Sequence, residues 1–370
     1  MQGPTSGPAP RPLDAKRLTL MSGCSSPCHA EVPVGSHRCT RRAYPDDMRI
    51  VVIGGSGHIG TFLIPRLVRA GHEVITISRG RRSSYVADPA WQEVRHVSAD
   101  RAAEDAEGTF PDRIAELGAD VVVDLISFTL ESEKALVERL RGNTGHLLYC
   151  GSMWRYGPSW KLPITEDSGT PPVGEYGIQK AATARMLKDE TAAGGLVTTS
   201  LHPGHISGPG WHPIGPLGNI ETSVWRNLSA GEPIAVPGIG GEFMHHVHAD
   251  DVAQAFELAL THRDAAAGQD FTVVAPSALN VRGYAQIAAS WFGQTANLQT
   301  VTWEEFRRTT SADAYELSWG HLYRDQYCSI DKARDLLGYT PRYEPEDAIL
   351  ESVRWLIDHG QLDIAQPLKV

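Results

Sequence analysis

Short apolar runs alternate with longer amphipathic stretches along most of the chain from Met48 onward. An apolar run of about four to eight residues, bounded by turn residues, is typical of a buried strand. Such runs lie at Arg49–Ile53, Glu73–Ser78, Val94–Ser98, Asp120–Leu125, His146–Cys150 and Thr198–His202. The stretches between them repeat apolar residues at helical spacing, which predicts helices that pack on a sheet. This order predicts an α/β fold with a doubly wound parallel sheet.

The pattern changes after His202, where loops rich in glycine and proline separate shorter helices. These helices are expected near Ile220–Ala230, Asp250–His262, Arg282–Phe292 and Ala348–His359. We therefore expect a first domain over residues 48–203, to which later segments such as 245–262 return. A smaller, loop-rich lobe is expected over 204–363, followed by a tail over 364–370.

Residues 1–47 are rich in proline, glycine, serine and arginine and show no helical or strand periodicity. This composition predicts a disordered extension, or a start codon assigned too early. The extension contains potential metal ligands at Cys24, Cys28, His29, His37 and Cys39. Their spacing matches no paired zinc-binding pattern, so we predict no metal site.

Composition narrows the class of protein. The chain has 370 residues with 34 Lys+Arg against 44 Asp+Glu, a formal net charge of −10. An acidic surface repels phosphate backbones and anionic lipid, so we expect neither nucleic acid nor membrane as a partner. The sequence has no apolar run of the roughly 20 residues that a spanning helix needs, and its five cysteines form no disulfide framework. We expect a cytoplasmic protein.

A glycine-rich loop, GGSGHIG, follows the first predicted strand directly and leads into the first predicted helix. Gly54 and Gly57 permit a tight turn and the approach of a pyrophosphate to the helix N-terminus, and Gly60 permits close packing of helix and strand. In this strand–turn–helix context the loop predicts dinucleotide binding, with His58 and Ile59 as further contacts.

The end of the second predicted strand indicates which dinucleotide is bound. An NAD site usually has Asp or Glu here to bind the ribose 2′-hydroxyl, but this strand ends in Ser78 and Arg79, followed by two more arginines. A guanidinium suits a 2′-phosphate, so we predict NADP as preferred over NAD. The alternative is a solvated basic loop. Asp100 and Arg101, after the third strand, are either adenine contacts or a surface turn.

Three further residues suggest the chemistry. Ser152 follows the strand that ends at Cys150, and Tyr176 and Lys180 lie four residues apart on one face of a predicted helix. The ammonium of Lys180 is expected to lower the pKa of the Tyr176 phenol and to bind a ribose. Ser152 is expected to hold the substrate oxygen, which completes a site for hydride transfer with a nicotinamide.

With these motifs the sequence resembles the extended short-chain dehydrogenase/reductase family, the NAD(P)-dependent epimerase/dehydratases, over Met48–Asp363. The matching segments are GGSGHIG, GSMWRYG, YGIQK, HPGHISGPG (similar to the family's RPxxIYGPG), HVHADDVAQA and SIDKARDLLGYTP. The resemblance implies a Rossmann-type fold in which the smaller C-terminal lobe binds substrate.

The resemblance also implies residue roles. Tyr176 would be the catalytic acid/base, Lys180 its partner and a ligand of the cofactor ribose, and Ser152 the ligand of the substrate oxygen. The remaining cofactor contacts implied in this way are Leu125, Ile126, His202 and Pro203.

Two departures from the family pattern bear on the substrate. Met153-Trp154 follow Ser152 where dehydratases have Asp-Glu, which disfavours dehydration. Arginines that grip a nucleotide diphosphate are missing at Met244 and near Trp319, unless Arg324 replaces one. We therefore expect a smaller or more aromatic substrate than a nucleotide sugar.

Aromatic and imidazole side chains in the later loops suit a ring-shaped, partly apolar ligand, although ordinary core packing is the alternative for many of them. The candidate substrate contacts are Trp154, His205, Trp211, His212 and Met244.

The sequence thus predicts an NAD(P)-dependent redox enzyme that acts on a secondary alcohol or ketone of a small, sugar-like or secondary-metabolite substrate. It does not separate a reductase or dehydrogenase from an epimerase. The alternatives are a nucleotide-sugar epimerase and a non-catalytic NADP-binding sensor or scaffold. The expected partner is the small-molecule substrate, and a homodimer is left open.

Overall fold

The computed structural model describes residues 47–168 and 170–370. Its main sheet has seven parallel strands in the order β11-β6-β5-β4-β1-β2-β3. The strands are β1 (Arg49–Ile53), β2 (Glu73–Ser78), β3 (Arg95–Ser98), β4 (Val121–Asp124), β5 (His146–Cys150), β6 (Thr198–Pro203) and β11 (Asp270–Val273). Because β1 pairs with both β2 and β4, the strand order reverses at β1, and ligands of such sheets bind where it does.

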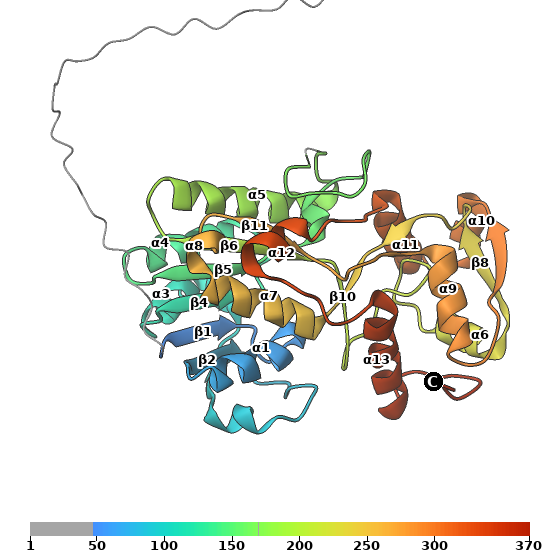
Figure 1. Cartoon of the computed structure of the whole chain (residues 1–370), viewed down its shortest axis with the longest axis horizontal. Coiled ribbons are helices and arrows are strands. Elements are labelled where there is room, and N and C mark those ends of the chain that lie inside the picture. Colours follow the sequence, from blue (N-terminus) through green and yellow to red (C-terminus); the bar gives the residue numbers. More distant parts are fainter. Residues whose placement is uncertain (1–46, 169) are drawn as a thin grey trace, which may run out of the picture. The chain divides into compact units, whose positions relative to one another are not determined.

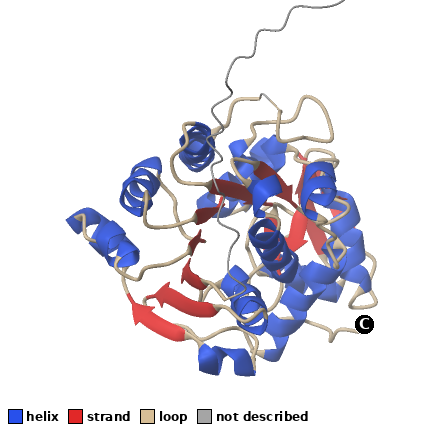
Figure 2. Ribbon diagram, turned by 60° about the vertical axis from the view of Figure 1, so that its left-hand side comes forward, coloured by secondary structure: helices blue, strands red, loops and turns tan. Residues whose placement is uncertain are grey.

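Helices cover both faces of this sheet (Figure 2). Side chains alternate along β1, so that Ile50 and Val52 enter one core while Val51 and Ile53 enter the other. The helices around the sheet are α1 (His58–Arg69), α2 (Arg101–Glu107), α3 (Phe110–Ala115), α4 (Leu130–Leu140), α5 (Gly174–Ala192), α7 (Ala249–Thr261), α8 (Arg263–Ala266) and α12 (Asp331–Leu337). The predicted Rossmann-type α/β architecture is confirmed.

A separate apolar core contains Trp225, Tyr284, Phe292 and Val353. The elements around it are α6 (Ser223–Ala230), β8 (Pro233–Pro237), α9 (Val281–Ser290), β13 (Asn297–Val301), α10 (Trp303–Thr309), α11 (Ala312–Arg324) and α13 (Pro345–Asp358). Figure 1 shows β8, α6 and α9 together at a distance from β1 and β2.

Short strand pairs complete the fold. They join β7 (His205–Ser207) to β10 (His246–His248) and β9 (Phe243–Met244) to β12 (Leu279–Asn280). Two 3-10 turns lie at η1 (Pro89–Glu93) and η2 (Met153–Arg155).

The six expected strands appear within one or two residues of their predicted ends, but β11 was not predicted. Its run of four residues is followed by further apolar residues in a loop-rich stretch, where strand and loop are hard to separate. The expected N-terminal extension, with its cysteines and histidines, lies outside the described residues except for Asp47. Among the described residues, no helix is long and apolar enough to cross a membrane.

Candidate functional site

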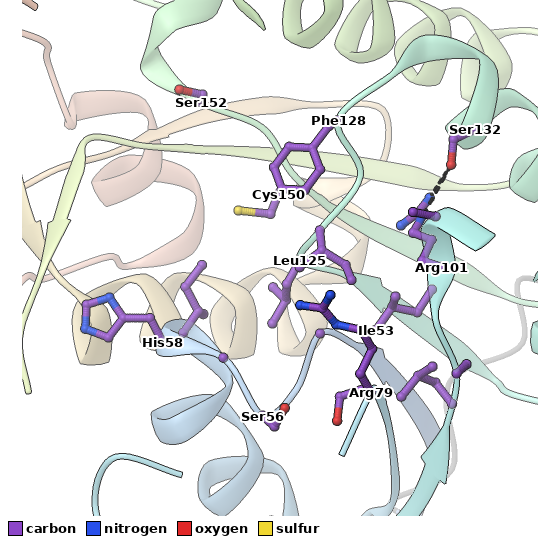
Figure 3. A pocket seen from close by; sticks show the side chains of 18 of the residues that line it. Ile53, Ser56, His58, Arg79, Arg101, Leu125, Phe128, Ser132, Cys150 and Ser152 are labelled. Atoms are coloured by element: carbon purple, nitrogen blue, oxygen red, sulfur yellow. Dashed lines mark hydrogen bonds between the residues drawn. The ribbon is translucent and has the colours of Figure 1, made fainter. Parts of the chain in front are cut away.

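A cavity of about 930 Å³ opens at the carboxyl edge of the sheet, where the strand order reverses. It is lined by the glycine loop, the ends of β2 and β3, the loops after β4 and β5, the start of α5 and residues 203–211. Figure 3 shows side chains from these segments around one space. The volume lies at the upper end of the range for cofactor and substrate pockets.

The glycine loop forms a cradle that side chains would fill. Gly54 has a φ of +83°, and a Cβ there would lie 2.6 Å from Ile126. A Cβ at Gly60 would lie 1.9 Å from the carbonyl oxygen of Gly55. Gly57 begins α1 without a side-chain cap, so the first turn presents its amides as a phosphate site does. These features fit a dinucleotide.

The three arginines after β2 all line the cavity. Arg79 and Arg81 are exposed, and Figure 3 shows the Arg79 side chain reaching toward the space between the glycine loop and Leu125. Ser78 Oγ instead bonds His96 Nε2 at 2.8 Å. No carboxylate occupies the end of β2, as the sequence indicated.

Arg101 is held within the protein. Its guanidinium pairs with Asp124 and Asp105 and, at 3.5 Å, with Glu133. It also donates to Ser132 Oγ at 2.9 Å (Figure 3). Burial, together with the neighbouring Asp124, raises the pKa of Glu133 to about 8. Arg101 and Asp100 line the cavity. A contact of Arg101 with the adenine, as predicted, would be made by a guanidinium that already binds three carboxyl groups.

Ser152, Tyr176 and Lys180 meet at the cavity. The buried ammonium of Lys180 donates to the carbonyls of Ser127, at 2.7 Å, and Cys150, at 2.8 Å. Burial raises the pKa of Tyr176 to about 12, and a hydrogen bond with Ser152 opposes this shift. The ammonium of Lys180 lies 5.7 Å from the centroid of the Tyr176 ring, and the expectation that it lowers the pKa of Tyr176 stays a prediction.

The other expected cofactor contacts divide into two groups. Leu125, Ile126 and Pro203 line the cavity, as do His58 and Ile59. His202 does not line it: the side chain is fully buried beneath the loop that carries Ser152 and accepts a hydrogen bond from the Ser152 amide. His202 therefore supports the Ser152 loop and does not line the cavity.

The candidate substrate residues also differ in whether they lie near the cavity. Trp154 packs edge-on against Tyr176 with 5.9 Å between ring centroids, and the guanidinium of Arg324 lies 3.7 Å above the Trp154 ring. His205 lies between two other histidine rings, and neither of its ring nitrogens has a hydrogen-bond partner among the described residues.

The remaining candidates lie elsewhere. Trp211 stacks on His58 at 5.1 Å, so it covers the glycine loop. His212 is partly exposed and is not among the residues that line the cavity. Met244 is fully buried in the second apolar core. The prediction that Met244 contacts substrate is wrong, because β9 turns this side chain into that core.

Phe128 and Cys150 are among the cavity residues that sequence reasoning missed. Phe128 is 58% exposed despite being a large apolar residue, and its ring lies 5.3 Å from the Lys180 ammonium. Its position just after a predicted strand end was the available signal, since ligands of parallel sheets bind there.

Comparisons with known proteins agree with this geometry. The NAD dependent epimerase/dehydratase family model matches residues 50–274, more than half of the chain. The chain is 28% identical to 2′-dehydrokanamycin reductase of Streptomyces kanamyceticus over 57% of each chain. It is 26% identical to the UDP-glucose 4-epimerase of Azospirillum brasilense, over 82% of this chain and 90% of that protein.

A further relative is the chloroplast stem-loop binding protein of 41 kDa b of Arabidopsis thaliana, 26% identical over 85% of this chain and 80% of its own length. Among solved structures, the UDP-glucose 4-epimerase of Thermotoga maritima superposes with a TM-score of 0.64 at 19% identity, covering 84% of this chain and 99% of that one. This likeness supports the fold. The chain belongs to the NAD-dependent epimerase/dehydratase family, the extended short-chain dehydrogenase/reductases that its motifs resemble.

Proposed function

We propose that the protein reduces a ketone on a small, ring-shaped substrate with NADPH as hydride donor. The observation that carries this proposal is the meeting of Ser152, Tyr176 and Lys180 in the cavity that the glycine loop also lines. The bound nicotinamide supplies the hydride. Ser152 Oγ holds the substrate oxygen, the Tyr176 hydroxyl gives it a proton, and Lys180 fixes the main chain around both.

Tyr176 is in the protonation state that reduction requires. With a pKa raised to about 12, the phenol carries its proton at neutral pH and can donate it to the substrate oxygen. The similarity to 2′-dehydrokanamycin reductase agrees with a reductive direction.

NADPH is the proposed cofactor because Arg79, Arg81 and Arg82 line the cavity where β2 ends without a carboxylate. A charged hydrogen bond contributes about 1.5–3 kcal/mol. Arg79→Ala should therefore weaken NADPH binding by about 10- to 100-fold and leave NADH binding nearly unchanged. Equal affinity of the wild type for the two cofactors in a fluorescence titration would contradict the preference.

Arg324 supports a second candidate, a UDP-sugar 4-epimerase. It is 5% exposed, no described carboxylate pairs with it, and it donates to the carbonyl of Val173 at 2.7 Å. Burial lowers its pKa to about 10. A buried cation without a counterion is costly, and an anionic group on a substrate would relieve that cost. The UDP-glucose 4-epimerase relatives favour this reading.

One experiment separates the two functions. Calorimetry with UDP and UDP-glucose on the NADPH-loaded protein is compared with NADPH oxidation by a panel of cyclic and aryl ketones. The proposed reductase should oxidise NADPH with a ketone and bind neither nucleotide below millimolar concentration. Micromolar binding of UDP-glucose would favour the epimerase. A thermal shift tests the cofactor itself, because a ligand at about 100 times its Kd stabilises by about 2.7 kcal/mol.

A further inference from the structure

Beneath the loop that carries Ser152, a carboxylate, an imidazole and a main-chain amide are connected by hydrogen bonds between neighbouring strands. Asp270 lies on β11, His202 on the neighbouring β6, and Ser152 just after β5. The Ser152 amide donates to His202 Nδ1 at 3.3 Å, and His202 Nε2 lies 3.2 Å from Asp270 Oδ1. Both side chains are buried, at 0% and 4% exposure.

These contacts determine the tautomer of His202. An amide can only donate, so Nδ1 has to be unprotonated where it meets Ser152. The ring proton is therefore on Nε2, which is the nitrogen that faces Asp270. Burial and the charge of Arg155 lower the pKa of His202 to about 4, although Asp270 opposes this shift. The imidazole is thus neutral near pH 7 and oriented by the carboxylate.

His202 and Asp270 also contact the chain on either side of Ser152, at Gly151 and Arg155. A Cβ added at Gly151 would lie 2.0 Å from His202 Nδ1, so the chain passes directly over the imidazole. On the other side, Arg155 reaches Asp270 at 3.6 Å. The other charged groups that act on this pair are Lys180 on α5, which lowers the pKa of His202, Lys188 on α5, at 4.0 Å from Asp270, and Lys332 on α12, which is attracted by the Asp270 carboxylate.

The residue at position 202 departs from the pattern that the chain resembles. The family pattern RPxxIYGPG has arginine where this sequence has His202. An arginine side chain has no acceptor, so it cannot receive the Ser152 amide as the imidazole does.

We propose that His202 and Asp270 are a positioning pair that accepts the Ser152 amide and thereby sets where Ser152 Oγ stands relative to Tyr176. The proposal rests on the proposed function in one respect, because it takes Ser152 as the ligand of the substrate oxygen. Neither His202 nor Asp270 contacts substrate.

Two substitutions at His202 test the pair through kinetics. His202→Gln keeps one acceptor for the Ser152 amide and one donor for Asp270, whereas His202→Leu keeps neither at similar volume. A displacement of about 1 Å costs on the order of a hundredfold in rate. We expect His202→Leu to lower kcat for the best ketone of the panel by about that factor with the Kd for NADPH unchanged, and His202→Gln to recover at least tenfold of the loss. Equal kcat for the two variants would overturn the proposal.

A spectroscopic measurement on the wild type makes the test independent of turnover and of variant folding. Nitrogen shifts of ¹⁵N-histidine-labelled protein report the tautomer, and the His202 signals are those absent from His202→Gln. The proposal requires a neutral ring protonated at Nε2 between pH 6 and 8. Protonation at Nδ1, or a charged ring, would overturn it. If the wild type reduced no ketone, the proposed function would fail, while the tautomer would still decide the pairing of His202 with Ser152.

Discussion

The proposed cofactor end, around the glycine loop, and the proposed substrate end, around Trp154 and Arg324, are built in different ways. At the cofactor end the main chain itself forms the site: Gly54 and Gly60 leave no room for side chains, and α1 begins against the cavity. At the substrate end the site is made of side chains brought from distant segments, such as Trp154 with Arg324. A local motif can encode the first kind of site, whereas only tertiary packing defines the second.

Tyr176→Phe should have the largest effect and tests whether the two ends meet in one reaction. The substitution removes the proposed proton donor and little volume. Loss of general acid catalysis costs about 10²- to 10⁴-fold, so kcat should fall by that factor while the Kd for NADPH stays constant. Tyr323→Phe, at an exposed tyrosine of α11, is the matched control. A Tyr176→Phe enzyme with near-normal kcat would mean that another group supplies the proton.

The proposed role of Tyr176 also predicts a pH dependence. With a pKa of about 12, the phenol is in its donating form across the neutral range and loses the proton only in strong alkali. Ketone reduction should therefore be insensitive to Tyr176 ionisation from pH 6 to 9, and alcohol oxidation should accelerate as pH rises. Paired rate profiles in the two directions measure this, and an oxidation rate that falls above pH 7 would contradict it.

A comparison of Met244→Ala with Trp154→Ala separates a residue of the second apolar core from a proposed substrate contact. Met244 is completely buried, and removing such a side chain costs about 2–5 kcal/mol of unfolding free energy. We expect this loss in urea unfolding with an unchanged KM for the ketone. Trp154 contacts Tyr176 and Arg324 instead, so Trp154→Ala should raise KM. A raised KM for Met244→Ala at full stability would restore Met244 as a substrate contact.

Gly60→Ala tests the cofactor end. The added methyl would lie 1.9 Å from the carbonyl oxygen of Gly55, so α1 has to shift, and overpacking of this kind costs about 1–3 kcal/mol. NADPH binding should weaken together with stability. Gly241→Ala is the control because its nearest neighbour would be 3.7 Å away. Undiminished NADPH affinity in Gly60→Ala would show that the cradle is more adaptable than its geometry indicates.

The contrast between the two ends also explains what the sequence could and could not predict. The strands around β1 and the loop from Gly54 to Gly60 follow from local patterns, because their constraints are backbone ones. The burial of Met244 and the position of His202 beneath Ser152 depend on β9, β6 and β11, and no local pattern in the sequence encodes those pairings.

Arg101 illustrates the same limit near the cofactor. Its proximity to the cavity follows from its place after β3, but its three carboxyl partners come from α2, β4 and α4. Sequence alone predicts where this arginine lies along the chain but not which carboxyl groups surround it.

The smallest effect of a single substitution is expected on the stability of the protein in acid. Most of the buried histidines that set this stability lie near the proposed substrate residues. Burial lowers the pKa of eight histidines among the described residues. They are the half-buried His72 and the buried His58, His146, His202, His205, His245, His246 and His321. Each is neutral when folded and takes up a proton below about pH 6.5 when unfolded. Stability is therefore complete above that pH and is lost as pH falls toward the folded values, which for His146 and His246 are about 3.

His146→Gln and His246→Gln remove one such proton each, the first from β5 of the sheet and the second from β10 near the substrate residues. One proton corresponds to a slope of about 1.4 kcal/mol per pH unit. Urea unfolding from pH 4.5 to 6 should show the dependence of the unfolding free energy on pH reduced by about that amount in either variant, and by about twice that amount in the double variant, since the sites are independent. A slope that stayed at the wild-type value in His246→Gln alone would mean that the substrate end already opens to water in acid before the sheet unfolds.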